Sequence, residues 1–208
     1  MACFPFLIEL NEKKCVIAGG GTIAARKVKS MLEFGANVTV IAPEIQEEIK
    51  ERSEQIRIIC REIQEQDLQG ADVVILATDQ PEINHRLAQY CKENKILVNV
   101  VDVKEDCGFY FPAIIKQEDV VVSISTAGES PLLASYIRKE IEENLNTYYG
   151  NIAKMLGEIR EDVFLRFSSP KIRKEVFQQL ISWGIRKQGN YEKKECLEFL
   201  EQLENAQH

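Results

Sequence analysis

The chain contains 208 residues, of which 45% are hydrophobic and 28% charged, values typical of a globular protein rather than a disordered chain. Its formal net charge of −7 argues against non-specific nucleic-acid binding, which needs clustered Lys and Arg to neutralise phosphates. No apolar run approaches the roughly 18 residues of a membrane span, and the apolar start Met1–Leu10 lacks the basic leading segment of a signal peptide. We therefore expect a cytoplasmic protein with neither a nucleic-acid nor a membrane partner.

Five short apolar runs alternate with helical periodicity over the first hundred residues. The expected strands cover 15–18, 38–41, 56–60, 73–77 and 96–101, and the expected helices cover 22–34, 44–52 and 81–94. Continuous apolar strands that alternate with helices indicate a parallel sheet covered on both faces. Right-handed crossovers then predict an α/β protein with a doubly wound, Rossmann-like sheet.

The pattern changes after Asp102. The expected elements are a small antiparallel pair at 109–115 and 120–124, a helix that starts at Ser130-Pro131 with Ser as N-cap and, from 151 onward, several helices, one starting at Ser169-Pro170 and the last capped by Asn190. The fold is thus expected to continue as a small α+β segment and then a helical domain. We place domain boundaries near residues 110 and 148.

The six cysteines are scattered without a CxxC pair, so neither a zinc site nor a secreted disulfide framework is predicted. Buried thiols are the expectation, because Cys15 opens one apolar run and Cys60 ends another. The two histidines are too few for a histidine-built metal site within one chain, and no metal is expected. The residues concerned are Cys3, Cys15, Cys60, Cys91, Cys107, Cys196, His85 and His208.

The first expected strand leads into the glycine-rich segment Gly19-Gly20-Gly21-Thr22-Ile23-Ala24, which fits the pattern GxGxxA. Gly19 allows a tight turn, Gly21 lets the backbone approach a pyrophosphate, and Ala24 permits close packing of helix on strand. The N-terminus of the following helix offers free N–H groups to phosphates. A glycine turn without a ligand is the alternative, but the strand–turn–helix context favours a dinucleotide.

The second expected strand ends at Ile41-Ala42-Pro43, with Glu44 just beyond. An acidic residue in this region usually binds the ribose hydroxyls of the dinucleotide. Two roles for Glu44 stay open, contact with the ribose and capping of the next helix. No arginine follows the strand to receive a 2′-phosphate, so NAD is favoured over NADP.

Polar residues end the fourth and fifth expected strands, in Ala77-Thr78-Asp79 and in Asn99-Val100-Val101-Asp102. Ligands bind at the carboxyl ends of such strands, so Asp102 is a candidate carboxylate base beside the reacting carbon. The alternative for Asp102 is a turn or cap residue. Asp79 precedes Gln80-Pro81 and is expected to cap a helix.

Hydroxyl groups cluster at Ser123, Ser125 and Thr126, beside Gly128. Hydroxyls and backbone N–H groups near a glycine suit recognition of a carboxylate. A strand edge followed by a capped helix start explains the same residues, and from the residues alone this second interpretation is favoured.

Taken together, these features resemble the precorrin-2 dehydrogenases and the N-terminal module of bifunctional and multifunctional sirohaem synthases. The resemblance covers about residues 3–145 and is carried by the segments 4–10, 16–21, 24–27, 77–79, 99–102, 111–114 and 123–134. It implies NAD-dependent oxidation of precorrin-2, a tetrapyrrole, to sirohydrochlorin in sirohaem or related biosynthesis. It also implies a homodimer whose middle segment exchanges between subunits. The three parts then become an NAD-binding domain (1–110), a dimerisation segment (111–148) and a helical C-terminal domain (149–208).

The resemblance also assigns roles to individual residues. Asp102 occupies the position of the family's essential aspartate. The resemblance, the glycine motif and the end of the fourth expected strand together predict the residues that bind the cofactor. These are Gly19, Gly20, Gly21, Thr22, Ile23, Pro43, Glu44 and Thr78. Ser125 and Thr126 fall in the substrate-facing loop. Lys104, Arg138 and Lys139 are candidates to offset the substrate's carboxylates, or are solvated surface charges.

Two alternative functions stay open. The first is a bifunctional enzyme that also inserts ferrous iron or cobalt, because some relatives are proposed to use the same aspartate for both steps. The second is a non-catalytic dinucleotide-sensing module, which would have no reason to keep Asn99–Asp102 together with the loop from Ser125 to Pro131. Turnover of NAD with a reduced tetrapyrrole separates the enzyme from the sensor.

Overall fold

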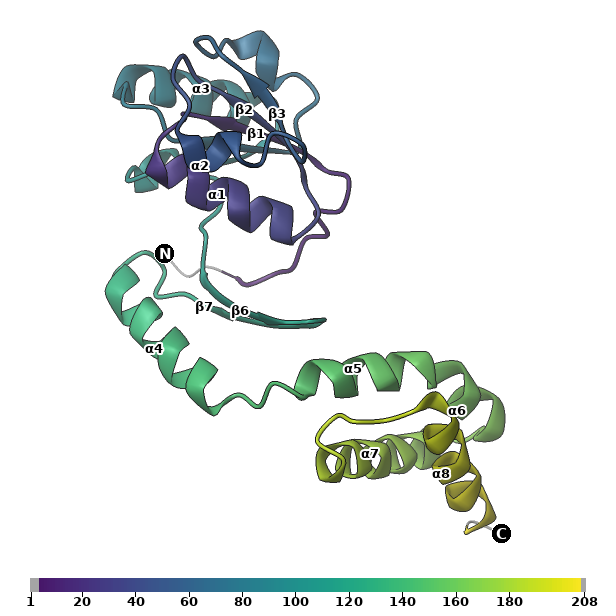
Figure 1. The fold of residues 1–208 in the computed structure, drawn as a ribbon. Helices are drawn as coiled ribbons and strands as arrows, with labels where there is room; N and C mark the ends of the chain where they lie inside the picture. Colours follow the sequence, from purple (N-terminus) through teal and green to yellow (C-terminus); the bar gives the residue numbers. More distant parts are fainter. Residues whose placement is uncertain (1–3, 207–208) are drawn as a thin grey trace. The chain divides into compact units, whose positions relative to one another are not determined.

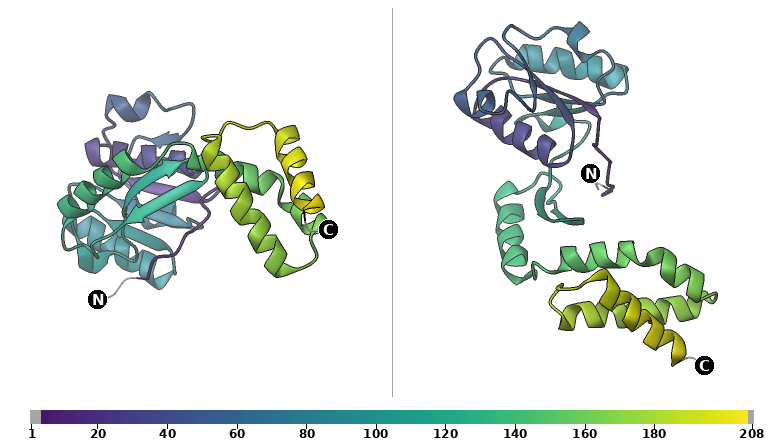
Figure 2. Two further views of the ribbon diagram at one scale, coloured as in Figure 1. Left: turned by 90° about the horizontal axis from the view of Figure 1, so that it is seen from below. Right: turned by 45° about the vertical axis from the view of Figure 1, so that its right-hand side comes forward.

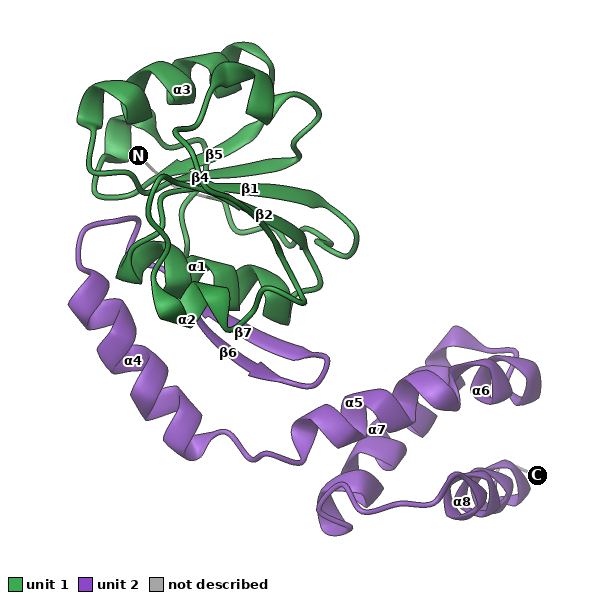
Figure 3. Cartoon of the chain, turned by 45° about the horizontal axis from the view of Figure 1, so that its top comes forward, with its two compact units in different colours: residues 1–111 green, residues 112–208 purple. Residues whose placement is uncertain are grey.

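The computed structural model describes residues 4–206 and divides into two compact units, residues 1–111 and 112–208 (Figure 3). Cys3 and His208 lie outside the described residues. A further division near residue 148 stays a prediction. Among the described helices, none combines the length and apolar character needed to cross a membrane.

Unit 1 is a five-stranded parallel sheet in the order β3-β2-β1-β4-β5, with α1 and α2 on one face and α3 on the other (Figures 1 and 3). This arrangement confirms the doubly wound, Rossmann-like sheet expected from the sequence. The elements are β1 (Lys14–Ala18), α1 (Thr22–Glu33), β2 (Asn37–Ile41), α2 (Glu47–Lys50), β3 (Arg57–Ile59), η1 (Glu65–Leu68), β4 (Val73–Leu76), α3 (Pro81–Glu93), β5 (Leu97–Val100) and η2 (Lys104–Asp106).

The central strand β1 is buried on both faces, which explains its unbroken apolar sequence. Cys15 and Ile17 pack into the core beneath α1, and Val16 and Ala18 pack into the core beneath α3. All four side chains are at most 1% exposed. Because successive side chains of a strand point to opposite faces, one apolar run supplies both cores.

The structure differs from the sequence expectations at the second helix and at one cysteine of unit 1. The helix expected over 44–52 is reduced to α2, because residues 43–46 form an irregular turn in which the Gln46 N–H donates to the Gly20 carbonyl at 2.9 Å. Cys60 is exposed rather than buried. It follows β3, which lies at the edge of the sheet, and edge positions lack a covering neighbour.

Unit 2 begins with an antiparallel hairpin, and α4 lies alongside it (Figures 1 and 2). The elements are β6 (Ala113–Gln117), β7 (Val120–Ile124), α4 (Pro131–Asn144), α5 (Tyr149–Glu158), α6 (Arg160–Arg166), α7 (Pro170–Arg186) and α8 (Lys193–Asn205). Ser130 caps α4 as predicted, since its hydroxyl accepts a hydrogen bond from the Leu133 N–H at 3.2 Å.

The expected cap of the last helix is wrong. The N-cap of α8 is Glu192, in a capping box with Glu195, and not Asn190. Gln188 and Gly189 both have positive φ, so the chain turns there and continues without helix to Glu192. Helices α5–α8 then enclose their own apolar core, which includes the fully buried Met155.

The hairpin is much less buried than the helical core. Among the ten residues of β6 and β7, only Ile115 is fully buried, although most of the others are apolar. Helix α4 likewise buries only Ala134. The hairpin and α4 therefore leave apolar surface that unit 2 does not cover.

Two glycines of α5 provide a matched test of packing in unit 2. A Cβ on Gly150 would lie 2.6 Å from the Gln117 carbonyl oxygen, whereas a Cβ on Gly157 would meet no atom within 4 Å. We expect Gly150→Ala to lower the free energy of unfolding by about 1–3 kcal/mol through overpacking. Gly157→Ala should raise it by up to about 1 kcal/mol through helix propensity. Denaturant unfolding of both variants measures the difference, and equal effects would contradict the packing described.

Candidate functional site

A cleft of about 600 Å³ opens at the carboxyl ends of β1, β2 and β4. This is the edge at which open α/β sheets bind ligands, and the volume lies within the usual range of ligand sites. The lining residues come from four loops: Gly19–Gly21, Ile41–Gln46, Glu62–Ile63, and Ala77–Gln80 together with Ile83. Six of the predicted cofactor residues thus meet in one place: Gly19, Gly20, Gly21, Pro43, Glu44 and Thr78.

Two glycines of this loop are required by their neighbours. Gly19 has φ of +116°, and a Cβ there would lie 2.3 Å from the Ala77 carbonyl oxygen. A Cβ on Gly20 would lie 1.9 Å from the Glu44 carbonyl oxygen. Both distances are far inside van der Waals contact, so a side chain at either position would force the loops apart. The tight-turn role predicted for Gly19 agrees with this geometry.

Gly21 differs, because a Cβ there would meet no atom within 4 Å. The space beside its backbone is open. Gly21 is the N-cap of α1, no side chain caps that helix, and its first turn carries no acidic residue. An anion could therefore approach the free N–H groups and the positive end of the helix dipole. These features fit the pyrophosphate of a dinucleotide.

The two remaining predicted cofactor residues lie on the first turn of α1, outside the lining of the cleft. The Thr22 hydroxyl donates to Gln46 Oε1 at 3.2 Å, which links the start of α1 to the loop after β2 that lines the cleft. The Ile23 side chain is 42% exposed.

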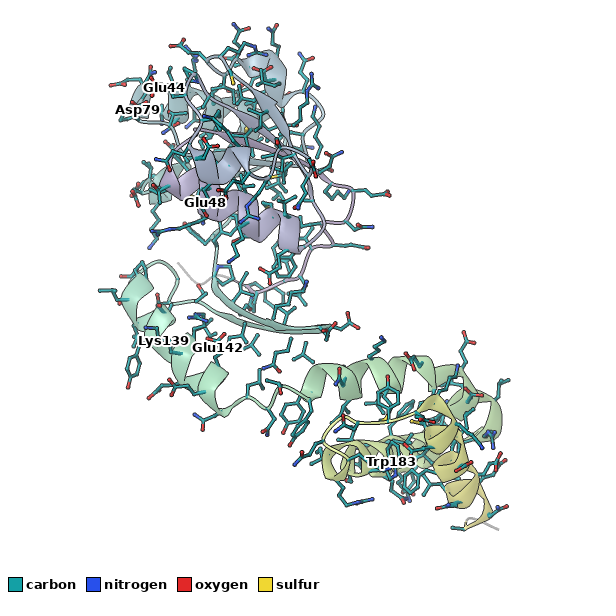
Figure 4. The ribbon with its side chains drawn as sticks, in the orientation of Figure 1. Glu44, Glu48, Asp79, Lys139, Glu142 and Trp183 are labelled. Atoms are coloured by element: carbon teal, nitrogen blue, oxygen red, sulfur yellow. The ribbon has the colours of Figure 1, made fainter. Side chains whose placement is uncertain are left out.

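The lining of the cleft carries negative charge. Glu44, Glu62 and Asp79 all line the cleft, and Figure 4 labels Glu44 and Asp79 near one another. Glu44 does not cap the next helix, since the N-cap of α2 is Gln46. Among the described lining residues none is Lys or Arg. A 2′-phosphate would find no cation there, which favours NAD over NADP.

Thr78 is held by a residue that the sequence interpretation missed. Its hydroxyl donates to Asn84 Oδ1 at 2.7 Å, and Asn84 Nδ2 donates to the Thr78 carbonyl at 3.0 Å. Asn84 is only 6% exposed and lies on α3. An amide among the apolar positions of an amphipathic helix was the available signal. The expected capping role of Asp79 is wrong, because the N-cap of α3 is Gln80.

Asp102 follows β5, which pairs in parallel with β4, so it lies at the same edge of the sheet as the cleft without lining it. Its side chain is exposed, and its φ of 61° places the backbone in the left-handed region. A non-glycine residue there costs about 1–2 kcal/mol, although Asp tolerates it better than most. Such strain occurs at functional sites and also in ordinary turns, so the catalytic role of Asp102 stays a prediction.

The Asp102 loop, residues 101–107, closes on the Cys107 thiol. Cys107 Sγ accepts from the Val100 N–H at 3.3 Å and lies within hydrogen-bond distance of the carbonyls of Val100 and Val103, at 3.2 and 3.3 Å. Burial raises the pKa of this thiol, so it stays protonated and can donate. The buried amide of Asn99 donates to the Phe109 carbonyl at 3.0 Å and fixes the exit of the loop.

The predicted substrate residues are divided between the units. Lys104 lies on η2 of unit 1, and the others lie in unit 2. The Thr126 hydroxyl donates to the Ser130 carbonyl and accepts from its N–H, and Ser125 Oγ accepts from the Ala127 N–H. Arg138 pairs with Glu142, which Figure 4 labels on α4. Both hydroxyls thus shape the turn before α4.

Comparison with protein families gives two matches along the chain. The family model described as "Putative NAD(P)-binding" matches residues 6–113, and the model "Sirohaem biosynthesis protein central" matches residues 122–144. The first covers the cleft and the Asp102 loop, and the second covers the last three residues of β7, the hydroxyl cluster and α4.

Individual proteins show the same similarity. The chain is 37% identical over 187 residues to a sirohaem synthase of Nitrosospira multiformis and 38% identical over 181 residues to one of Photorhabdus laumondii. These alignments cover 87% and 86% of the chain but 40% and 38% of the relatives, so the chain spans about two fifths of their length. Among solved structures, SirC, a precorrin-2 dehydrogenase, matches with a TM-score of 0.72 and 28% identity, covering 98% of this chain and all of SirC.

The glycine loop yields a prediction that separates ligand contact from folding. Gly21→Ala should lower the unfolding temperature only slightly, by the cost of Ala at an N-cap. It should weaken binding of NAD about tenfold or more, because its methyl group enters open space beside the phosphates. Gly20→Ala should lower the unfolding temperature, because its methyl group meets the Glu44 carbonyl. Calorimetric titration with NAD and thermal unfolding measure the two effects. Normal NAD affinity in Gly21→Ala would contradict the assigned phosphate site.

Proposed function

Because this chain belongs to the family described as "Putative NAD(P)-binding" and also matches the central domain of sirohaem biosynthesis proteins, we propose that it oxidises precorrin-2 to sirohydrochlorin with NAD. The reaction transfers a hydride from the tetrapyrrole to NAD⁺ and releases a proton, giving sirohydrochlorin, NADH and H⁺. The observation that carries the proposal is the position of Asp102. It has an exposed carboxylate on a backbone with positive φ, and it lies at the same sheet edge as a cleft suited to a dinucleotide. The similar proteins include sirohaem synthases and a precorrin-2 dehydrogenase, which supports this choice.

The cofactor role belongs to the residues of the cleft. NAD, when bound, supplies the acceptor for the hydride. The backbone beside Gly21 and the N-terminus of α1 would hold its pyrophosphate. We assign to Glu44 the hydrogen bonds from the ribose hydroxyls, which its place in the cleft lining supports. Thr78, held by Asn84, would contribute a polar side chain from the loop after β4.

We assign to Asp102 the acceptance of the proton that the substrate releases. The Asp102 carboxylate is solvent-accessible and projects from the end of β5. As a base it accepts the proton that the macrocycle loses, and as an anion it orients the ring for hydride loss. The Cys107 and Asn99 hydrogen bonds hold the base and the exit of the loop that carries this carboxylate.

We further propose that the active form is a homodimer with tetrapyrrole as its substrate. Helix α4 exposes 84% of Leu132, 50% of Leu133 and 60% of Tyr136. The neighbouring hairpin is half-buried and rich in apolar side chains. A second copy of the chain would cover this surface, in agreement with the exchange of the middle segment that the family resemblance implies. We also propose a cytoplasmic location, since the scattered cysteine spacing does not resemble a secreted disulfide framework.

An anaerobic assay of Asp102→Asn tests the proposed chemistry. Asn tolerates the left-handed conformation as Asp does, so the loop should keep its shape while losing its base. We expect NADH formation from precorrin-2 to fall at least about 100-fold, with NAD affinity and unfolding temperature unchanged. Absorbance follows NADH and sirohydrochlorin together.

Asp102→Gly serves as the control for strain. Glycine relieves the positive φ, so this variant should be at least as stable as the wild type and equally inactive. A wild-type protein that binds NAD but forms no NADH would overturn the dehydrogenase in favour of a sensing module. Full activity in Asp102→Asn would remove the carboxylate from the chemistry. Faster consumption of sirohydrochlorin with added ferrous iron, relative to a protein-free control, would reveal a chelatase activity.

A charge introduced on α4 tests the dimer. Leu132→Glu combined with Tyr136→Glu places two carboxylates on the exposed apolar surface and should convert the dimer to monomer, because burying unpaired charges is strongly unfavourable. Glu143→Ala, on the same helix and also exposed, is the matched control and should remain dimeric. Size-exclusion chromatography with light scattering gives the mass of each. A monomeric wild type would refute the proposed assembly.

A further inference from the structure

We propose that His85 is a positioning residue for Asp102, acting through a hydrogen bond to Asp106 that fastens the Asp102 loop to helix α3. The inference rests on the proposed function, in which Asp102 handles the proton. His85 lies on α3 and Asp106 at the end of η2, and His85 Nδ1 is 2.8 Å from Asp106 Oδ2.

The carboxylate of Asp106 is nearly inaccessible, since the residue is only 5% exposed. A buried carboxylate needs hydrogen bonds or cations to replace the water it has lost. Lys92 Nζ approaches Asp106 Oδ1 only to 3.8 Å, beyond hydrogen-bond distance, and instead donates to the Glu105 carbonyl at 2.9 Å. Among the described side chains, His85 thus supplies the close hydrogen bond to this carboxylate.

This hydrogen bond secures the outer part of the loop. The Cys107 thiol closes the base of the loop on Val100 and Val103, but it does not hold the residues that project beyond. The Asp106 side chain ties η2 to α3, four residues after Asp102. Because the Asp102 loop is held both at its base and at η2, Asp102 has little freedom to change its left-handed backbone conformation.

The geometry of His85 suits an anchor rather than a catalyst. Nδ1 faces the buried carboxylate and donates to it, while 61% of the side chain is exposed. His85 does not line the NAD cleft. Its loss should therefore affect the placement of Asp102 and leave the cofactor site as it is.

The test compares three single variants of the full chain. His85→Ala removes the donor, His85→Asn retains a donor near the position of Nδ1, and Arg86→Ala is the matched control. Arg86 is the next residue of α3, its side chain is equally exposed at 61%, and it pairs with Glu65 at 3.4 Å, away from the Asp102 loop. The measurements are kcat and KM for NAD in the anaerobic assay and hydrogen exchange of the backbone amides of residues 100–109.

We expect His85→Ala to lower kcat about 10- to 100-fold, because a misplacement of about 1 Å has effects of this size. Its KM for NAD should stay within about twofold of the wild type, and the amides of Cys107, Gly108 and Phe109, hydrogen-bonded in the structure, should exchange faster. His85→Asn should recover most of kcat, and Arg86→Ala should match the wild type throughout.

Other outcomes overturn the inference. If His85→Ala keeps both its kcat and its loop protection, His85 does not position Asp102. An equal loss of kcat in Arg86→Ala, or a parallel rise in KM for NAD, would show a general effect on α3 instead. A wild type that forms no NADH defeats the proposed function alone, since loop exchange in His85→Ala still decides whether this hydrogen bond holds the Asp102 loop.

Discussion

Two backbone carbonyls occupy the space that side chains at residues 19 and 20 would need, and the cleft depends on this exclusion. Ala77 at the end of β4 and Glu44 beyond β2 approach the glycine loop to distances that no Cβ permits. The chain leaving β1 is thereby held close to its two neighbours, and the start of α1 is directed toward the space between them. Larger side chains would separate the three loops and remove the concave surface on which any ligand contact rests.

Much of unit 1 could be predicted because its determinants are local. Runs such as residues 15–18 and 73–76 are apolar without interruption, and the intervening helices carry apolar residues at helical spacing, so strand and helix assignments follow from periodicity. The turn at residues 43–46 could not be predicted in the same way. Its conformation results from the approach of Glu44 to Gly20, a contact between segments more than twenty residues apart.

The candidate site shows the same division between local and distant determinants. Asp102 and the glycine loop stand at strand ends, where a polar residue after an apolar run is visible in the sequence. Asn84, His85 and Asp106 act through partners that are 6 to 21 residues distant. Asn84 stands among the apolar positions of an amphipathic helix, but its partner is not visible in the sequence. Nothing in the immediate sequence of His85 and Asp106 distinguishes them from surface residues, and only the packing of α3 against the loops at the sheet edge reveals their contact.

Adjacent residues of α3 hold two different loops. Asn84 binds Thr78 on the loop after β4, and His85 binds Asp106 on the loop after β5. A single turn of α3, which is stiffer than either loop, therefore fixes the distance between the cofactor side and the carboxylate side of the site. The same helix thus sets the positions of the loop after β4 and the loop after β5. Insertions elsewhere in the two loops could therefore accumulate during evolution without changing that separation, whereas a rotation of α3 by one residue would misalign both sides at once.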